Sequence, residues 1–170
     1  PDDASREAAQ MLADAGNTEM QLKLNVNIKK REGFRPFAPV VTEEDALDYF
    51  DVPPSEHMVH VTGIRQDKRK DIPAEFSFRS MTEKMRYIKS TLPAITHIDF
   101  TARAQAVKAS GNHNLWRLVK EFGKRSGYPV LINTSMNVRG EPIACTPEDA
   151  LGVFAQTGMD YLVIENFIVK

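Results

Sequence analysis

The segment from residue 128 to residue 156 constrains the fold most, because it contains a strand, a polar loop and a helix in immediate succession. YPVLIN at 128–133 is a short apolar run rich in β-forming residues. A helix is predicted over 147–156, with Thr146 as its N-cap and Pro147 at its first position. A strand that passes through a short loop into a helix indicates a sheet with helices packed on it.

The remaining elements follow from the spacing of apolar residues and from start and stop signals. Helices are predicted over residues 5–14, 19–29 and 114–126, with Gly127 as a C-cap, and after the capping-box-like segment 42–45. Strands are predicted over 36–42, 57–64, 97–109 and 160–170. Two prolines make 36–42 an edge or irregular strand, and 97–109 is one strand or two paired short ones. Residues 19–29 also alternate like a strand, and 160–170 has a break near Glu165. The predicted class is α/β in the mixed α+β sense, with helices packed on a mixed sheet.

Composition restricts the function classes. The 170 residues suit one domain, and the net charge of −1 disfavours a partner that is a nucleic acid. No apolar run reaches the roughly 18–20 residues that span a membrane, and the polar, acidic start does not resemble a signal peptide. Cys145 is the single cysteine, which excludes an internal disulfide, so we expect a cytoplasmic protein. A chain that begins at Pro1 suggests a fragment of a longer protein.

The first polar cluster lies in NIKKREGFRPFAP at residues 27–39. If the backbone there is extended, Lys29 and Arg31 point to the same side and Lys30 points away. Two cations on one side suit a polyphosphate or an acyl phosphate, since lysine offers a point charge and arginine a two-pronged donor. The alternative is that these residues form the basic last turn of a helix and complement its dipole.

The second cluster lies in THIDFTARAQ at residues 96–105, where every odd position is polar and its neighbours are apolar. The polar positions are His97, Asp99, Thr101, Arg103 and Gln105. On a strand they share one face, which is either the floor of a polar pocket or simply exposed to solvent. His97 and Asp99 could ligate a metal, but no third ligand stands at a convincing spacing, so no metal site is predicted.

The third cluster follows the strand at 128–133 and contains Asn133, Thr134, Ser135, Asn137 and Arg139. Ligands bind open α/β sheets at the carboxyl ends of strands. Gly140 permits a turn that other residues resist. The alternative is a loop that is held by Asx and Ser turns. Cys145 has no adjacent histidine, so we interpret it as a buried small residue.

Three blocks together carry a family resemblance. They are KKREGFRPFAPVV at 29–41, PAITHIDFTARAQAV at 93–107 and PVLINTSMNVRGEPIACTPEDAL at 129–151. In this order they resemble the C-terminal domain of the NodU/CmcH-type O-carbamoyltransferases. The resemblance covers residues 19–170 and implies a YrdC-like twisted open sheet, with 1–18 as a helical segment or linker from an upstream domain. Met136 stands where the family motif NTSFN has an aromatic residue, and we expect it to fill the same apolar space.

The resemblance also implies an activity and roles for the polar residues. The domain is expected to bind ATP, with Mg²⁺, and carbamoyl phosphate, and to form a carbamoyl-adenylate. A sugar-kinase-like domain outside these residues, which holds iron, would transfer the carbamoyl group to a hydroxyl acceptor. Catalytic roles fall to Lys29, Arg31 and Arg103; further phosphate or nucleotide contacts to Ser135, Asn137 and Arg139; and supporting roles to His97, Thr101, Asn133 and Thr134.

Two other functions stay open on sequence grounds. One is a stand-alone enzyme similar to the threonylcarbamoyl-adenylate synthases, which would act on threonine and bicarbonate. The other is a non-catalytic module that holds a nucleotide or RNA on a basic concave face. Near-neutral charge disfavours RNA, because RNA binding usually needs basic surface and aromatic stacking platforms.

Overall fold

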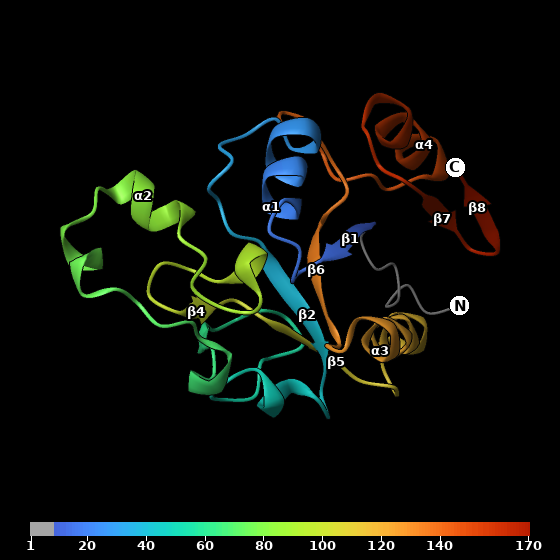
Figure 1. Ribbon diagram of the computed structural model, residues 1–170. Coiled ribbons are helices and arrows are strands. Elements are labelled where there is room, and N and C mark those ends of the chain that lie inside the picture. The colour runs from blue at the N-terminus through green and yellow to red at the C-terminus, as the bar shows by residue number, and fades with distance from the viewer. Residues whose placement is uncertain (1–8) are drawn as a thin grey trace.

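A central sheet with helices on both sides organises the molecule in the computed structural model, which describes residues 9–170 (Figure 1). Among these residues the sheet has four strands in the spatial order β1-β6-β2-β5. The strands are β1 Gln10–Asp14, β2 Ala38–Thr42, β5 Gln105–Val107 and β6 Val130–Ser135. β6 is antiparallel to both of its neighbours, whereas β2 and β5 are parallel. The predicted mixed α/β class is confirmed.

Helix α3, His113–Ser126, packs on one face of the sheet. Its Leu115 and Val119 form a buried apolar cluster with Val40, Val107 and Leu131, which come from three strands. The predicted C-cap is confirmed, because Gly127 adopts the left-handed conformation with a φ of 86°.

The opposite face is covered by α1, Met20–Leu22, and the π-helical turn Lys23–Ile28 that continues it. Leu24 and Ile28 are buried in the main apolar cluster, whereas the exposed fractions of Leu22 and Val26 are 59% and 46%. The buried pair is four residues apart, as one face of a helix requires. The predicted helix is confirmed, and the strand that the alternation of this segment also allowed does not form.

Smaller elements surround the sheet. Two more helices are α2 Met81–Arg86 and α4 Pro147–Gln156. Two antiparallel pairs join β3 Thr62–Gly63 to β4 Thr101–Ala102, and β7 Leu162–Ile164 to β8 Phe167–Val169. Short 3-10 turns occupy Ala46–Asp48, Gln66–Lys68, Ala74–Phe78 and Pro93–Ile95.

The predicted start of α4 and the predicted C-terminal break are both confirmed. The Thr146 hydroxyl accepts a hydrogen bond from the Asp149 backbone amide, and Asp149 completes a capping box. The last residues form a hairpin that turns at Glu165, whose φ is 52°.

The predicted helix over 5–14 is wrong where the structure describes it. Gln10–Asp14 is strand β1, paired along its length with β6, and residues 5–8 lie outside the described part. Met11 packs into the main cluster on one face of the sheet, and Leu12 packs on the α3 cluster on the other. Because both faces are covered, this strand lacks the polar–apolar alternation that marks a half-exposed strand. β1 also shares one sheet with β6, which lies in the segment assigned to 19–170.

Three predictions for the middle of the chain need correction. β2 is an interior strand between β6 and β5. Proline is tolerated at position 39 because the pairing of β2 with β5 begins at Val40, so the missing amide of Pro39 costs no hydrogen bond to β5. The predicted strand over 57–64 is reduced to Thr62–Gly63. The predicted strand over 97–109 is two short strands that belong to different sheets and do not pair with each other.

The predicted capping box at 42–45 is also wrong. The Thr42 hydroxyl donates to the Asp45 carboxylate at 2.5 Å, and this carboxylate pairs with Lys120 of α3 at 2.9 Å. The Asp45 carboxylate, which a capping box would need as the acceptor for the Thr42 backbone amide, is therefore used in a tertiary ion pair. Within the described part of the chain, no helix is both long and apolar enough to cross a membrane.

Replacing the buried Ile132 with alanine should destabilise the fold far more than the same change at the exposed Ile168. Ile132 is 0% and Ile168 is 72% exposed. We expect Ile132→Ala to lower the free energy of unfolding by about 2–5 kcal/mol, because it leaves a cavity beneath the sheet. Ile168→Ala should change it by less than about 0.5 kcal/mol. Urea unfolding followed by circular dichroism measures both, and equal losses would contradict the assigned core.

Candidate functional site

One face of the central sheet changes from apolar to polar along its length. Side chains alternate between faces along a strand, and residues paired across strands share a face. The face under α3 carries Leu131 on β6 and Val107 on β5. Two residues away on the same strands, it carries Asn133 and Gln105, and the Asn133 amide donates to the Gln105 side-chain oxygen at 2.6 Å. The α3 cluster therefore ends where a polar floor begins.

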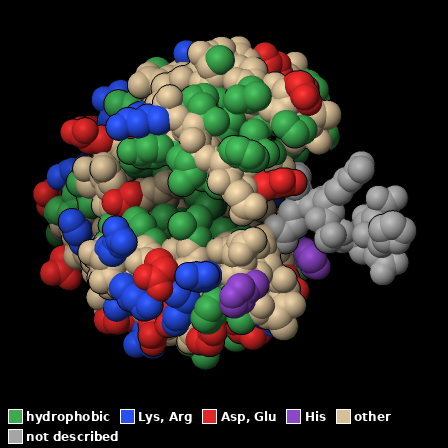
Figure 2. Space-filling view, turned by 90° about the vertical axis from the view of Figure 1, so that its right-hand side faces the viewer, with side chains coloured by type: hydrophobic (Ala, Val, Ile, Leu, Met, Phe, Trp, Pro, Cys, Tyr) green, Lys and Arg blue, Asp and Glu red, His purple; other side chains and the backbone are tan. Residues whose placement is uncertain are grey.

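Strand directions bring the second and third polar clusters to the same end of the sheet. β6 ends at Ser135, two residues past Asn133, while β5 begins at Gln105, two residues after the exposed Arg103. β5 is parallel to β2 and β2 is antiparallel to β6, so the end of β6 and the beginning of β5 meet at one edge. Figure 2 shows a hollow on the side of the molecule that carries α3 and α4, and the side chains visible on its floor are mainly hydrophobic.

Lys29 forms hydrogen bonds to the residues at the end of β6. It directly follows the π-helical turn and is only 6% exposed. Its ammonium donates to the carbonyl oxygen of Ser135 and to the carbonyl oxygen of Asn137, the latter at 3.1 Å. It also lies 3.3 Å from the Ser135 hydroxyl oxygen and 2.8 Å from the Asn137 Oδ1. The structure thus brings Lys29 of the first cluster into contact with Ser135 and Asn137 of the third.

Every acceptor around the Lys29 ammonium is neutral. Its hydrogen-bond partners are carbonyl, amide and hydroxyl oxygens, and it forms no ion pair with a carboxylate in residues 9–170. Burial lowers the pKa of Lys29 from 10.5 to about 8, and the positive charge of Arg31 adds to the effect. A buried cation without a counter-charge favours an anionic ligand.

Arg31 is held beside Lys29 by two contacts. Its Nε donates to the Asn25 Oδ1 at 2.6 Å, and its guanidinium lies 4.7 Å from the centre of the Phe37 ring. Asn25 is fully buried, and its amide in turn donates to the carbonyl oxygen of Arg35 at 2.7 Å. Burial lowers the pKa of Arg31, and Arg35 adds to this lowering while Glu32 opposes it.

Lys29 and Arg31 lie close together, as predicted, but the backbone conformation that brings them together differs from the predicted one. They were predicted to share a side of an extended segment, but Lys29 ends a helical turn and Lys30 has a φ of 50°. The left-handed residue between them reverses the chain and leaves Lys30 exposed, which matches the prediction that Lys30 points away.

Arg139 lies at the same edge as these cations. It is exposed, and together with Arg35 it contributes to the lowered pKa of Glu32, for which a backbone hydrogen bond is the largest cause. Gly140, the next residue, has a φ of 84°, which confirms the turn that the sequence predicts there. Arg35 of the first cluster and Arg139 of the third therefore both lie near the Glu32 carboxylate.

The second cluster is connected through hydrogen bonds. The Thr101 hydroxyl lies 2.9 Å from the His97 Nδ1 and donates to the Asp99 Oδ1 at 2.7 Å. Arg103 makes no hydrogen bond or ion pair with the residues from 9 to 170, although its charge contributes to lowering the pKa of His97. Arg103 and Arg139, which is also exposed and has no side-chain hydrogen bond or ion pair within residues 9–170, are therefore the predicted arginines most available to a ligand.

Thr134 is the predicted residue that the geometry separates from the others. It pairs with Met11 of β1, whose side chain packs in the main cluster, so it points to the face opposite Asn133 and Ser135.

Comparison with known proteins identifies a family for this sequence. The sequence matches the carbamoyltransferase C-terminus family over residues 8–170. The chain belongs to this family. It is 46% identical over 160 residues to an uncharacterised protein of Synechocystis, covering 94% of this chain and 26% of that protein.

Two further relatives of this carbamoyltransferase C-terminal domain carry informative names. The nodulation protein NolNO of Sinorhizobium fredii is 37% identical over 94% of this chain and 21% of its own length. The 3'-hydroxymethylcephem-O-carbamoyltransferase of Amycolatopsis lactamdurans is 32% identical over 91% of this chain and 25% of its own length. The chain thus spans about a quarter of the length of these relatives.

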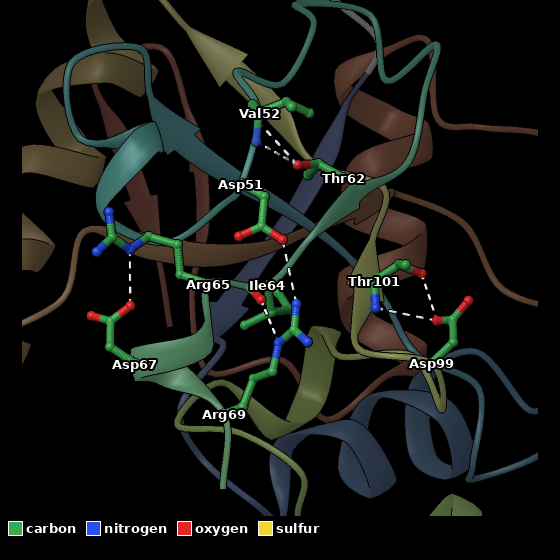
Figure 3. Close-up of polar contacts among 9 residues, drawn as sticks. All are labelled: Asp51, Val52, Thr62, Ile64, Arg65, Asp67, Arg69, Asp99 and Thr101. Atoms are coloured by element: carbon green, nitrogen blue, oxygen red, sulfur yellow. Dashed lines mark hydrogen bonds and ion pairs between the residues drawn. The ribbon is translucent and has the colours of Figure 1, made fainter.

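A cavity of about 670 Å³ lies elsewhere on the carbamoyltransferase C-terminal domain. It is lined by Leu47, Phe50, Asp51, Arg65, Gln66 and Asp67. Figure 3 shows that its charges are paired internally, with Arg65 on Asp67 at 2.9 Å and the nearby Arg69 on Asp51 at 3.3 Å. Because these cations already have carboxylate partners, the cavity lacks the free positive charge found around Lys29.

Two site residues were missed by sequence reasoning. Asn25 orients Arg31, and Gln105 holds Asn133, although Gln105 was noted on the polar side of its segment. Asn25 stands one residue after Leu24, and a polar residue on the buried side of a helix was the available signal. Cys145 also needs correction, since it is exposed. Met136 is 4% exposed and packs in the main cluster as expected.

Within residues 9–170, no three or more His, Cys, Asp or Glu side chains are grouped so that they could hold a metal ion.

The free energy of unfolding should rise with pH through the window set by Lys29. In the folded state its pKa is about 8, against 10.5 ordinarily, so the unfolded chain holds this proton more tightly. Stability gained from this group is thus absent below about pH 8 and grows between about 8 and 10.5, by at most about 3 kcal/mol. Urea unfolding of wild type and Lys29→Met at several pH values isolates the effect.

The exposed neighbour Lys30 provides the matched control. Lys30→Met should follow the pH dependence of wild type, whereas Lys29→Met should lack the rise. A constant difference between wild type and Lys29→Met across this window would contradict the burial of an uncompensated Lys29 ammonium.

Proposed function

We propose that this chain is the C-terminal domain of an O-carbamoyltransferase, and that it binds ATP and carbamoyl phosphate to form a carbamoyl-adenylate. The observation that carries the proposal is the buried Lys29 ammonium, which lacks a carboxylate partner in residues 9–170 and sits at the end of β6. Both substrates are polyanionic, so their phosphates supply the missing counter-charge. The name of the Amycolatopsis relative supports carbamoyl transfer to a hydroxyl group.

Each cation at the sheet edge has a distinct part in this proposal. Lys29 offers a point charge beside Ser135 and Asn137. The Ser135 hydroxyl donates to the Asn137 Oδ1 at 2.8 Å and one Asn137 N–H donates to the Glu141 carbonyl oxygen, so the second Asn137 N–H is the donor left for a phosphate oxygen. Arg31 is oriented by Asn25 and Phe37, so its remaining guanidinium nitrogens can bind two oxygens of one phosphate. Arg103 and Arg139 are exposed and approach from the neighbouring segments.

The proposed chemistry takes two steps within this domain. Water attacks the carbamoyl carbon of carbamoyl phosphate, the bond from this carbon to the phosphate oxygen breaks, and carbamate, phosphate and one proton are released. A carbamate oxygen then attacks the α-phosphorus of ATP, and pyrophosphate leaves with the bonding electron pair. Negative charge grows on the departing phosphates in both steps, so preorganised cations contribute more than a general base.

The last step belongs to a second domain in this proposal. The acceptor hydroxyl attacks the carbamoyl carbon and AMP leaves, in a sugar-kinase-like domain that holds iron. The length of the relatives, about four times the matched region, supports such a partner. The YrdC-like description of this domain and a cytoplasmic location belong to the same proposal.

The carbamoyltransferase proposal is favoured over a threonylcarbamoyl-adenylate synthase and over an RNA-binding module. The family match over residues 8–170 and the name of the Amycolatopsis relative both favour carbamoyl transfer to a hydroxyl group over action on threonine. The net charge of −1 and the pairing of Arg65 and Arg69 with carboxylates leave little basic surface for RNA.

Calorimetric titration of the chain with ATP–magnesium, first alone and then with carbamoyl phosphate present, tests the proposal. We expect one binding site, with one ligand changing the affinity for the other, because both are placed at the same edge. We expect no binding of RNA, whereas an RNA-binding module would bind RNA with an affinity that falls steeply with salt concentration. Absence of binding for both ligands would refute the proposal for this chain.

Replacing Arg103 with alanine should weaken carbamoyl phosphate binding without unfolding the domain. Its guanidinium has no hydrogen bond or ion pair with residues 9–170 that would be lost. Loss of charged hydrogen bonds to a phosphate, worth about 1.5–3 kcal/mol, predicts an affinity about ten- to hundredfold lower. Arg86→Ala, at an exposed arginine on α2, is the control and should bind as wild type does. Equal affinities for all three proteins would place the ligand elsewhere.

A further inference from the structure

Three side chains from the segment that precedes Arg103 form a short chain of hydrogen bonds whose proton positions can be assigned. The Thr101 backbone amide and hydroxyl both donate to the Asp99 Oδ1, at 3.2 Å and 2.7 Å (Figure 3). The same hydroxyl oxygen lies 2.9 Å from the His97 Nδ1. The His97 backbone amide donates to the Thr101 carbonyl oxygen at 2.8 Å, which fixes the two residues against each other.

These contacts determine which nitrogen of His97 carries its proton. The Thr101 hydroxyl donates to Asp99, and its hydrogen bonds keep the pKa of this carboxyl below the ordinary value, so Asp99 is an ionised acceptor. A hydroxyl has one hydrogen, which is used toward Asp99. The contact with His97 must therefore be a donation from Nδ1–H to the Thr101 oxygen. The lone pair of the neutral ring is then on Nε2.

His97 and Arg103 consequently offer opposite hydrogen-bonding properties, and they are close enough for the charge of Arg103 to act on the His97 ring. Burial lowers the pKa of His97, Asp99 opposes this, and the charge of Arg103 adds to the lowering, so the ring is neutral near pH 7. Arg103 can only donate hydrogen bonds, whereas Nε2 can only accept one. A phosphate dianion presents acceptors alone and has no group for Nε2. A carbamoyl group presents both kinds, an oxygen and an NH₂.

We propose that His97 determines specificity for the carbamoyl group, with its Nε2 accepting a hydrogen bond from the substrate NH₂ while Arg103 donates to the adjacent oxygens. Thr101 and Asp99 are positioning residues, since they act by holding His97 in the required tautomer. This inference rests on the proposed function and adds to it the group that distinguishes carbamoyl phosphate from other acyl phosphates.

Acetyl phosphate is the matched probe, because a methyl group replaces the NH₂ and the rest of the molecule is unchanged. Wild type should bind carbamoyl phosphate about tenfold more tightly than acetyl phosphate, as expected when a partly buried acceptor loses its donor. In His97→Phe this ratio should fall to about one, while acetyl phosphate affinity stays within about twofold of wild type. Titration calorimetry measures both ligands.

Two variants at Thr101 separate positioning from packing. Thr101→Val keeps the shape but removes the hydroxyl, so Nδ1 loses its acceptor and the carbamoyl preference should fall several-fold. Thr101→Ser keeps the hydroxyl and should retain the preference. Nitrogen NMR of wild type should show the His97 proton on Nδ1.

The possible outcomes distinguish this inference from the proposed function. If wild type binds carbamoyl phosphate and ATP but does not prefer carbamoyl over acetyl phosphate, or if His97→Phe keeps the preference, only the role of His97 is refuted. A proton on Nε2 in the NMR spectrum would refute it as well. If wild type binds neither ATP nor carbamoyl phosphate, the proposed function fails and the specificity role fails with it.

Discussion

The contact of the Lys29 ammonium with the end of β6 is the interaction on which the rest of the site depends. It joins the helical segment on one side of the sheet to Ser135 and Asn137 at the strand's carboxyl end. The ammonium is buried among neutral oxygens, which keeps its pKa near 8 and leaves its charge without a protein counter-ion in residues 9–170. The same contact therefore holds the loop after β6 in place and makes this edge attractive to anions.

The strand directions of the mixed sheet bring charged and polar residues from three segments of the chain to the same end of the sheet. Because β5 runs opposite to β6, Arg103 before β5 and Ser135 at the end of β6 come to one edge. α3 covers the apolar half of the shared face and ends its cluster at Leu131, before Asn133 and Gln105 begin the polar half. The fold thus provides a packed, apolar support at one end of the face and an accessible polar floor at the other.

Sequence reasoning succeeded where the signal was local and failed where tertiary contacts replaced it. The N-cap at Thr146 and the left-handed Gly127 depend on a few neighbouring residues, and both were predicted correctly. Met11 and Leu12 pack on opposite faces of a covered sheet, so their spacing imitated a helix. Thr42 lost its predicted capping role to the Asp45–Lys120 ion pair, a partner 75 residues away in sequence.

The sequence by itself determined the mixed α/β class and the three polar clusters. Through the order of its three residue blocks it also determined the resemblance to the carbamoyltransferase C-terminal family, which the match over residues 8–170 confirms. The tertiary structure decided how these clusters meet. Lys29 and Ser135 are 106 residues apart in sequence, and only the packing of a helical turn against a strand end brings them into contact. The tautomer of His97 was likewise decided in space, because it follows from where one hydroxyl hydrogen of Thr101 points. Chain periodicity contains the residue types but not the direction of their hydrogen bonds, which depends on the folded arrangement of both partners.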